Sequence, residues 1–139
     1  MDIELLKRKS TQADRALRRI HEFLPKSAHG LETDYSAQDI VYRNFQIAVQ
    51  NCVDMANHIA ASEGWQAPNS MRGIFDLLAQ NKFINSATRN KLRNMVIVRN
   101  ILVHDYTRID HKKAFGTIER GLKVISQYCG RLISHKHEK

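Results

Sequence analysis

Apolar residues recur at steps of three and four along nearly the whole chain, and this periodicity limits the possible folds more than any other feature of the sequence. The clearest stretch lies between Ser36 and Gly64, where Phe45 and Ile59 fall on one face of a helix. The sequence shows neither the sustained alternation of a β-strand nor a hairpin turn signal. We therefore expect an all-α bundle of four or five helices that forms a single domain over residues 1–139.

Capping residues and helix breakers mark the expected helix ends. Asp2 is placed to cap a first helix that ends before Pro25, and the segment 26–35, which has no periodicity, is expected to be a loop. The pair Ser36 and Asp39 resembles a capping box for the second helix. The later helices are expected to begin at Asn69 or Ser70, at Asn85 or Ser86, and at Asp110. The charged tail SHKHEK is expected to be frayed.

The chain carries a formal net charge of +8 at pH 7, which is high for 139 residues. Such a charge favours a polyanionic partner, either RNA or a strongly acidic protein, although solubility alone explains it in many small domains. We find no secretory signal pattern and no run of about 18 apolar residues. A soluble, cytoplasmic protein that does not contact a membrane is therefore expected.

The two cysteines, Cys52 and Cys129, lie inside helical patterns. They have no Cys-x-x-Cys spacing and no Cys/His ligand spacing, so we expect reduced, buried thiols and not a disulfide or a zinc site. We expect neither a metal nor any other cofactor.

The segment NMVIVRNILVHDYTRID (94–110) contains the residues best suited to catalysis: Arg99, His104 and Tyr106 in the spacing R-x4-H-x-Y. On a continuous helix Arg99 and Tyr106 lie on one face, whereas His104 is turned about 140° away from Arg99. One helix therefore cannot easily direct both Arg99 and His104 at one phosphate. Either the helix unwinds at His104, or a two-fold dimer presents both copies of the motif across one cleft.

These residue types suit the cleavage of RNA without a metal. That reaction needs a base for the proton of the ribose 2′-hydroxyl, a cation for the charge on phosphorus, and an acid for the leaving 5′-oxygen. Histidine, with a reference pKa of about 6.5, suits His104 to proton transfer. The planar, permanently charged guanidinium suits Arg99 to clamp a phosphate. The expected product is a 2′,3′-cyclic phosphate end.

The motif, its surroundings VRNILVHDYTRID and the upstream segments ANHIAASEGW and PNSMRGIFDLLAQ resemble HepT-like toxins over roughly residues 37–120. These toxins are HEPN-domain ribonucleases of toxin–antitoxin pairs. The resemblance implies the HEPN fold and a homodimer in which two copies of Arg99 and His104 meet in one groove. It also implies an MntA-like nucleotidyltransferase antitoxin that attaches AMP to Tyr106. The added bulk and negative charge would keep the substrate phosphate out.

Further residues are candidates for supporting roles. Asn100 either orients the phosphate or satisfies backbone, and Asp105 either orients His104 or lies in solvent, which is favoured because adjacent helical residues do not face each other. Tyr106 either contacts the substrate or packs at the edge of the core. A polar ridge at steps of four along the second expected helix either faces water or lines a cleft: Gln46, Gln50, Asp54, and Asn57 or His58. The resemblance favours the cleft for Asp54.

Two other classes of function compete with the ribonuclease. One is a non-catalytic helical adaptor, such as the substrate-binding bundle that accompanies some nucleotidyltransferases, and the other is a basic bundle that binds nucleic acid without cutting it. A bare R-x4-H pattern is common by chance, and Arg99 and His104 then need only be an ion-pairing residue and a helix-end histidine. The complete set with Tyr106 favours the enzyme. No base-reading module is visible, so the sequence does not predict which RNA is cut.

Overall fold

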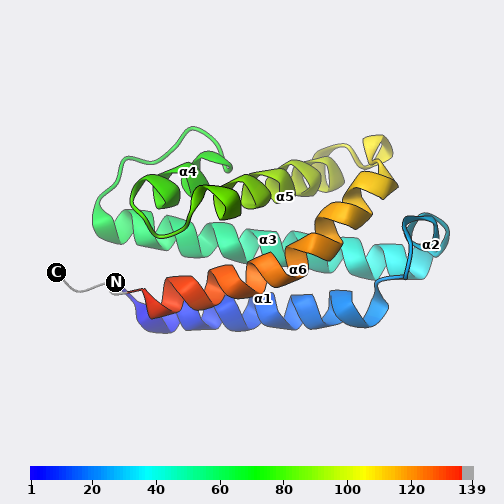
Figure 1. The fold of residues 1–139 in the computed structure, drawn as a ribbon, viewed down its shortest axis with the longest axis horizontal. Coiled ribbons are helices and arrows are strands. Elements are labelled where there is room, and N and C mark those ends of the chain that lie inside the picture. The colour runs from blue at the N-terminus through cyan, green and yellow to red at the C-terminus, as the bar shows by residue number, and fades with distance from the viewer. Residues whose placement is uncertain (136–139) are drawn as a thin grey trace.

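The computed structural model describes residues 1–135 and, over that range, contains six α-helices and one short 3-10 helix without any strand (Figure 1). The elements are α1 (Ile3–Phe23), α2 (Ala28–Thr33), α3 (Tyr35–Glu63), α4 (Gly73–Gln80), α5 (Ser86–His104), η1 (Tyr106–Arg108) and α6 (His111–Ser134). The all-α class is confirmed, with one helix more than expected. The end of the tail expected to be frayed, 136–139, lies outside the described residues.

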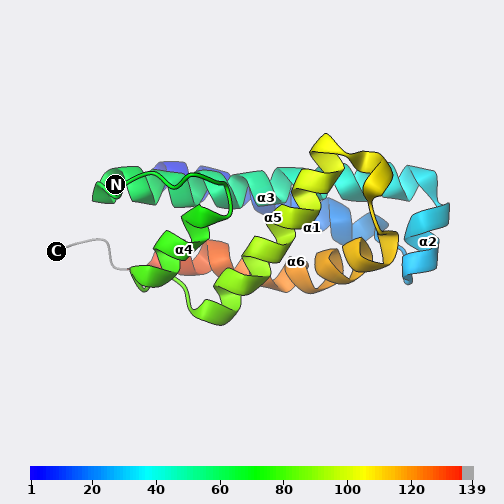
Figure 2. The same ribbon diagram turned by 90° about the horizontal axis from the view of Figure 1, so that it is seen from above.

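The two long N-terminal helices, α1 and α3, run antiparallel and side by side (Figure 1). Seen from above, α5 runs obliquely between α6 and α3 (Figure 2). The N-terminal half of α5 lies beside α6, and the C-terminal end of α5 lies beside α3. The 3-10 helix then returns the chain to the start of α6. The C-terminal half of α5, which carries Arg99 and His104 and is called the motif helix below, therefore lies directly on α3.

A single cluster of buried side chains joins the helices, with Tyr42, Phe45, Phe75 and Tyr128 among its largest members. The rings of Phe75 and Tyr128 meet edge to face at 5.9 Å. Both cysteines are free and buried in this cluster, as expected. No helix within residues 1–135 is long and apolar enough to cross a membrane.

Most expected helix ends are confirmed. The side chains of Asp2, Asn85 and Asp110 accept hydrogen bonds from backbone N–H groups in the first turns of α1, α5 and α6. Gly64 ends α3 in the left-handed conformation with φ of 72°, which glycine adopts without steric strain. The chain leaves α1 at Leu24, just before Pro25.

The prediction of a loop over 26–35 is wrong, because this segment contains α2. Ser27 Oγ accepts a hydrogen bond of 3.1 Å from the N–H of Gly30, and Leu31 is fully buried. A Cβ on Gly30 would lie 2.8 Å from Pro25 Cβ, so this glycine permits a close approach and does not break the helix. Burial of Leu31 stabilises a helix too short to form alone.

Two expected caps are also wrong. Asp34 and not Ser36 caps α3, because its Oδ1 accepts from Ala37 N at 3.1 Å, and Ser36 lies exposed in the first turn. Ser70 accepts from Gly73 N at 3.2 Å but belongs to a turn that precedes α4. At α3 the sequence offers two capping residues, Asp34 and Ser36, and Asp34 caps the helix. At α4 the N-cap is Arg72, whose side chain makes no capping hydrogen bond.

Candidate active site

The motif helix continues through His104 and ends only there. Asp105 leaves the helical conformation with φ of −154° and ψ of 62°, and Tyr106 opens the 3-10 turn. The helix therefore does not unwind before His104, and five helical residues still turn His104 about 140° from Arg99. Tyr106 lies beyond the helix, so it does not continue the face of Arg99 as a continuous helix would require.

Arg99 points toward α3 and is held on two sides. Its Nη2 donates to Gln50 Oε1 at 3.1 Å, and its Nη1 donates to Asn100 Oδ1 at 3.0 Å. Its Nε is buried and has no hydrogen-bond partner among residues 1–135. Within residues 1–135, the side chain of Asn100 thus bonds to Arg99 and not to the backbone. These bonds fix the direction of the guanidinium before any ligand arrives.

The contact to Gln50 extends into a chain of polar groups. Gln50 Nε2 donates to Asp54 Oδ1 at 2.9 Å, and Asp54 Oδ2 pairs with Lys9 Nζ of α1 at 3.1 Å. Because Gln50 receives from Arg99 and donates to Asp54, its amide orientation is set. The network links α1, α3 and α5 through partly buried side chains, where such bonds are stronger than at the surface.

This network lines a polar cleft of about 280 Å³ between these helices. Its lining is Lys9, Gln12, Arg43, Gln46, Ile47, Gln50, Asn51, Asp54 and Arg99. Of the two alternatives for the polar ridge, the cleft is therefore found for Gln46, Gln50 and Asp54, and the resemblance had favoured it for Asp54 alone. Asn57 is exposed instead, and His58 Nε2 accepts from Asp2 N at 2.9 Å. Three cations against one carboxylate give the cleft a positive charge that suits a phosphate.

His104 lies exposed at the C-terminus of α5, and its imidazole makes no hydrogen bond or ion pair with any residue in the range 1–135. Asp105 beside it pairs with Arg108 at 3.6 Å and accepts from Thr107 Oγ1 at 3.2 Å. Asp105 therefore faces solvent, as the favoured expectation had it, and does not orient His104. The imidazole is free to meet a substrate or a second protein chain.

Tyr106 is tied to α3. Its hydroxyl donates a short hydrogen bond to Oε1 of the buried Gln38, and its ring meets Tyr42 edge to face at 6.0 Å. The Tyr42 hydroxyl in turn lies 2.7 Å from His111 Nδ1. Burial, with the nearby carboxylate of Asp39, raises the pKa of Tyr106, which keeps its phenol protonated and able to donate.

Gln38, Tyr42 and His111 were not predicted as site residues from the sequence. One signal was available: Gln38 precedes Tyr42 by four residues and Phe45 by seven, which places a glutamine on the buried face of α3. A polar residue at such a position needs hydrogen-bond partners.

Apolar side chains are exposed around the motif. Ile97 is 41 % exposed and Val103 42 %, and Tyr106 is also 42 % exposed. Ile97 lies seven residues before His104 and shares its side of α5. Uncovered apolar groups of this size beside a polar site are typical of a protein interface.

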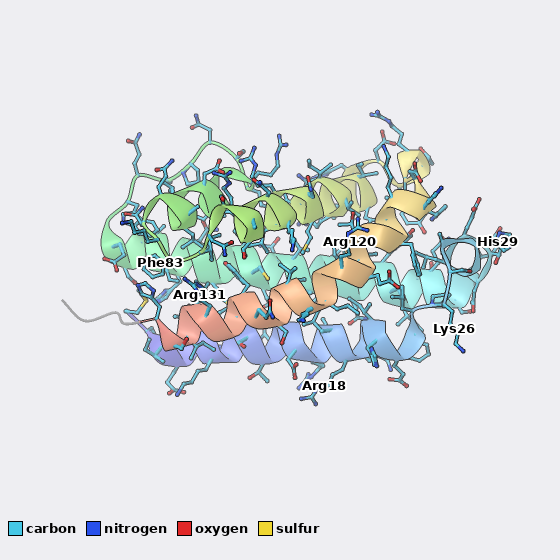
Figure 3. All side chains as sticks on the ribbon, in the orientation of Figure 1. Arg18, Lys26, His29, Phe83, Arg120 and Arg131 are labelled. Carbon is cyan, nitrogen blue, oxygen red and sulfur yellow. The ribbon has the colours of Figure 1, made fainter. Side chains whose placement is uncertain are left out.

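A second basic surface lies between α5 and α6. It is a groove of about 530 Å³, and its lining includes Lys91, Arg120, Lys123 and the single acid Glu119. Figure 3 shows Arg120 on α6 beside α5. None of the three cations forms an ion pair within the described part of the chain. Metal-binding groups of three or more His, Cys, Asp or Glu side chains do not occur in residues 1–135.

The sequence profile of the family described as "Ribonuclease HepT-like" matches residues 13–132. The chain belongs to the HepT-like ribonuclease family. The matched range contains the whole motif and every residue that lines the polar cleft except Lys9 and Gln12 of α1.

Known relatives agree with this assignment. The chain is 32 % identical to the "mRNA nuclease HepT" of Shewanella oneidensis over 114 residues, which cover 82 % of this chain and 85 % of the relative. Its fold matches a tri-AMPylated Shewanella oneidensis HEPN toxin solved in complex with an MNT antitoxin, with a TM-score of 0.88, 29 % identity, and coverage of 97 % of this chain and 100 % of the toxin. A toxin–antitoxin structure with AMP-PNP matches with a TM-score of 0.85 and 29 % identity over 95 % and 99 % of the chains.

Proposed function

We propose that this protein is the toxin of a toxin–antitoxin pair, an endoribonuclease that works without a metal ion. The observation that carries the proposal is the pairing of an oriented arginine with an accessible histidine: Arg99 is held by Gln50 and Asn100 in a positive cleft, and His104 is exposed at the end of the same helix. Membership of the HepT-like family and the similarity to an mRNA nuclease support RNA as the substrate.

The two residues have separate roles in the proposed reaction. One His104 takes the proton of the ribose 2′-hydroxyl, and the 2′-oxygen attacks phosphorus. Arg99 neutralises the charge that develops on the phosphoryl oxygens. The bond from phosphorus to the 5′-oxygen breaks, a protonated His104 from the second protomer donates a proton to that oxygen, and a 2′,3′-cyclic phosphate remains. Asn100 and Asp54 act indirectly, by fixing the direction of the guanidinium.

The directions of these side chains support a homodimer. Because Arg99 points into the cleft on α3 and His104 leaves the other side of α5, we infer that the Arg99 of one protomer meets the His104 of its partner. The exposed Ile97 and Val103 supply apolar area for such an interface. The symmetric arrangement places two copies of each residue in one groove.

The proposed antitoxin is an MntA-like nucleotidyltransferase that attaches AMP to Tyr106. The related Shewanella toxin carries three AMP groups in its complex with an MNT antitoxin. Tyr106 stands two residues after His104 and is 42 % exposed, so a partner enzyme can reach it. Attached AMP fills the substrate site with bulk and negative charge.

The test is cleavage of total cellular RNA by the purified protein in excess EDTA, beside His104→Ala and Arg99→Ala. We expect the unsubstituted protein to cut RNA and leave cyclic phosphate ends, while both variants keep their helical circular dichroism and cut at least about a hundredfold more slowly. Intact RNA with the unsubstituted protein, or equal cleavage by the variants, would overturn the proposal.

A further inference from the structure

Both partners of the hydrogen bond between Tyr106 and Gln38 are held in place by neighbouring groups. Gln38 is only 6 % exposed, and its Nε2 donates to the backbone carbonyls of Leu31 at 3.0 Å and Glu32 at 3.4 Å, in and beside the last turn of α2. Its Oε1 is therefore directed at the Tyr106 hydroxyl. If the amide turned over, both bonds to α2 would be lost and two carbonyl oxygens would face another oxygen.

The ring of Tyr106 is also held in place by packing. It packs edge to face against Tyr42, whose own ring stacks on His111 at 5.8 Å with only 10° between the planes. Tyr42 is buried, and its hydroxyl is bonded to His111 at the start of α6. Tyr106 thus rests on groups that α2, α3 and α6 hold in place.

The position of Tyr106 matters for His104 because only Asp105 separates the two. Asp105 N still donates to Ile101 O of α5 at 2.9 Å, and Ile109 N donates to Tyr106 O at 3.1 Å, which closes the 3-10 turn. An anchor at Tyr106 therefore determines where α5 ends and in which direction the His104 ring is presented. Other interactions of the turn, such as the pair of Asp105 and Arg108, lie in solvent and contribute little.

We propose that Gln38 is a positioning residue for RNA cleavage, and that nucleotide transfer to Tyr106 silences the site by breaking the Gln38 contact and releasing the turn after His104. This inference rests on the proposed function and adds a conformational step to the steric and electrostatic block. It also gives α2 a role, since α2 supplies the carbonyls that orient Gln38.

The chemistry of the transfer makes the release necessary. The Tyr106 oxygen attacks the α-phosphorus of a nucleoside triphosphate, pyrophosphate leaves, and the phenolic proton passes to a base of the transferase or to solvent. The ester oxygen that remains has no proton to donate. It would face Gln38 Oε1 as a second acceptor, and Gln38 is prevented from turning over. The modified side chain must therefore move away from α3.

Two variants remove this contact: Tyr106→Phe removes the donor while keeping the ring, and Gln38→Leu removes the acceptor together with the two hydrogen bonds to α2. We expect each to lower kcat for RNA cleavage by about tenfold or more with KM little changed, because a small displacement of His104 is sufficient for such a loss. The double variant should be no slower than the slower single variant, since both substitutions remove the bond between Tyr106 and Gln38. A Gln38→Leu enzyme with unchanged kcat, or a double variant whose losses multiply, would overturn the inference.

Backbone amide hydrogen exchange provides a readout that does not depend on cleavage. We expect faster exchange at Arg108 and Ile109 in both single variants and in the nucleotide-modified protein, with exchange in the middle of α6 unchanged. Unchanged exchange at this turn would overturn the inference. If the unsubstituted protein fails to cut RNA, the proposed function is wrong, and positioning for cleavage by Gln38 is overturned with it. The exchange result then still decides whether Gln38 holds the turn.

Discussion

Arg99 and His104 extend from the same helix in directions about 140° apart, and only Arg99 is bonded to α3. Arg99 is fixed within its own protomer by Gln50 and Asn100, whereas His104 has no partner among residues 1–135. One protomer therefore presents a prepared cation and a separate proton-transfer group that point to different places. A second copy is the simplest way to unite them.

Removal of the Gln50 contact should impair Arg99 without unfolding the protein. Gln50→Leu takes away the acceptor for Nη2 and leaves Asp54 paired with Lys9, so the guanidinium keeps only its bond to Asn100. We expect RNA cleavage to fall about tenfold to a hundredfold. The matched control is Asn57→Leu, which changes an exposed residue on the same helix and should cleave normally. Unimpaired cleavage by Gln50→Leu would show that the network is only structural.

Modification of Tyr106 is measurable by mass. When the protein is produced together with a nucleotidyltransferase encoded beside it, we expect its mass to rise by whole AMP units and its RNA cleavage to disappear. Tyr106→Phe, which has no hydroxyl, should gain no AMP. An inhibited protein of unchanged mass would indicate that the antitoxin acts by binding alone.

Most helix boundaries and the motif could be predicted from the sequence because local chemistry sets them. Asp2, Asn85 and Asp110 cap helices with their own side chains, and Gly64 ends α3 through its backbone freedom. The short helix α2 could not be predicted in this way, because it depends on burial of Leu31 against distant residues.

The same distinction applies to the candidate site. Spacing at steps of four revealed the ridge with Gln50 and Asp54, but nothing local paired Gln50 with Arg99, 49 residues further along the chain. Gln38 was missed for the same reason, since its partner Tyr106 is 68 residues away. Side-chain hydrogen bonds between helices depend on the tertiary arrangement, which periodicity does not supply.

The groove between α5 and α6 should contribute to RNA binding through charge. Lys91 and Lys123 line it without ion pairs to the described residues, so the double variant Lys91→Gln/Lys123→Gln should weaken binding and reduce the dependence on salt. For two lost phosphate contacts on single-stranded RNA, the slope of log K against log salt should fall by about 1.4 in magnitude. Lys26→Gln, in the turn between α1 and α2, is the control (Figure 3). An unchanged slope would exclude this groove from the binding surface.

The buried phenol of Tyr42 predicts how stability depends on pH. Burial, helped by Tyr106 and Asp110, raises the pKa of Tyr42 well above its usual value of 10.0. Above about pH 10 the unfolded chain loses this proton while the folded protein retains it, so the free energy of unfolding falls by about 1.4 kcal/mol per pH unit for this group. This stability is fully present below that pH. Denaturant titrations at alkaline pH should show a smaller slope for Tyr42→Phe, and an unchanged slope would contradict the assignment.

The most direct test of a site shared between protomers uses purified heterodimers with a different tag on each chain. One heterodimer joins an Arg99→Ala chain to a His104→Ala chain, and the other joins an unsubstituted chain to the Arg99→Ala/His104→Ala double variant. Each heterodimer keeps one copy of Arg99 and one copy of His104, which lie on different chains in the first heterodimer and on the same chain in the second. We predict that the first heterodimer, which keeps one Arg99–His104 pair across the interface, cleaves RNA well above either variant homodimer, but more slowly than the unsubstituted protein, because only one His104 remains for the two proton transfers. The second heterodimer keeps no such pair and should not cleave. Cleavage by the second heterodimer alone would contradict the account.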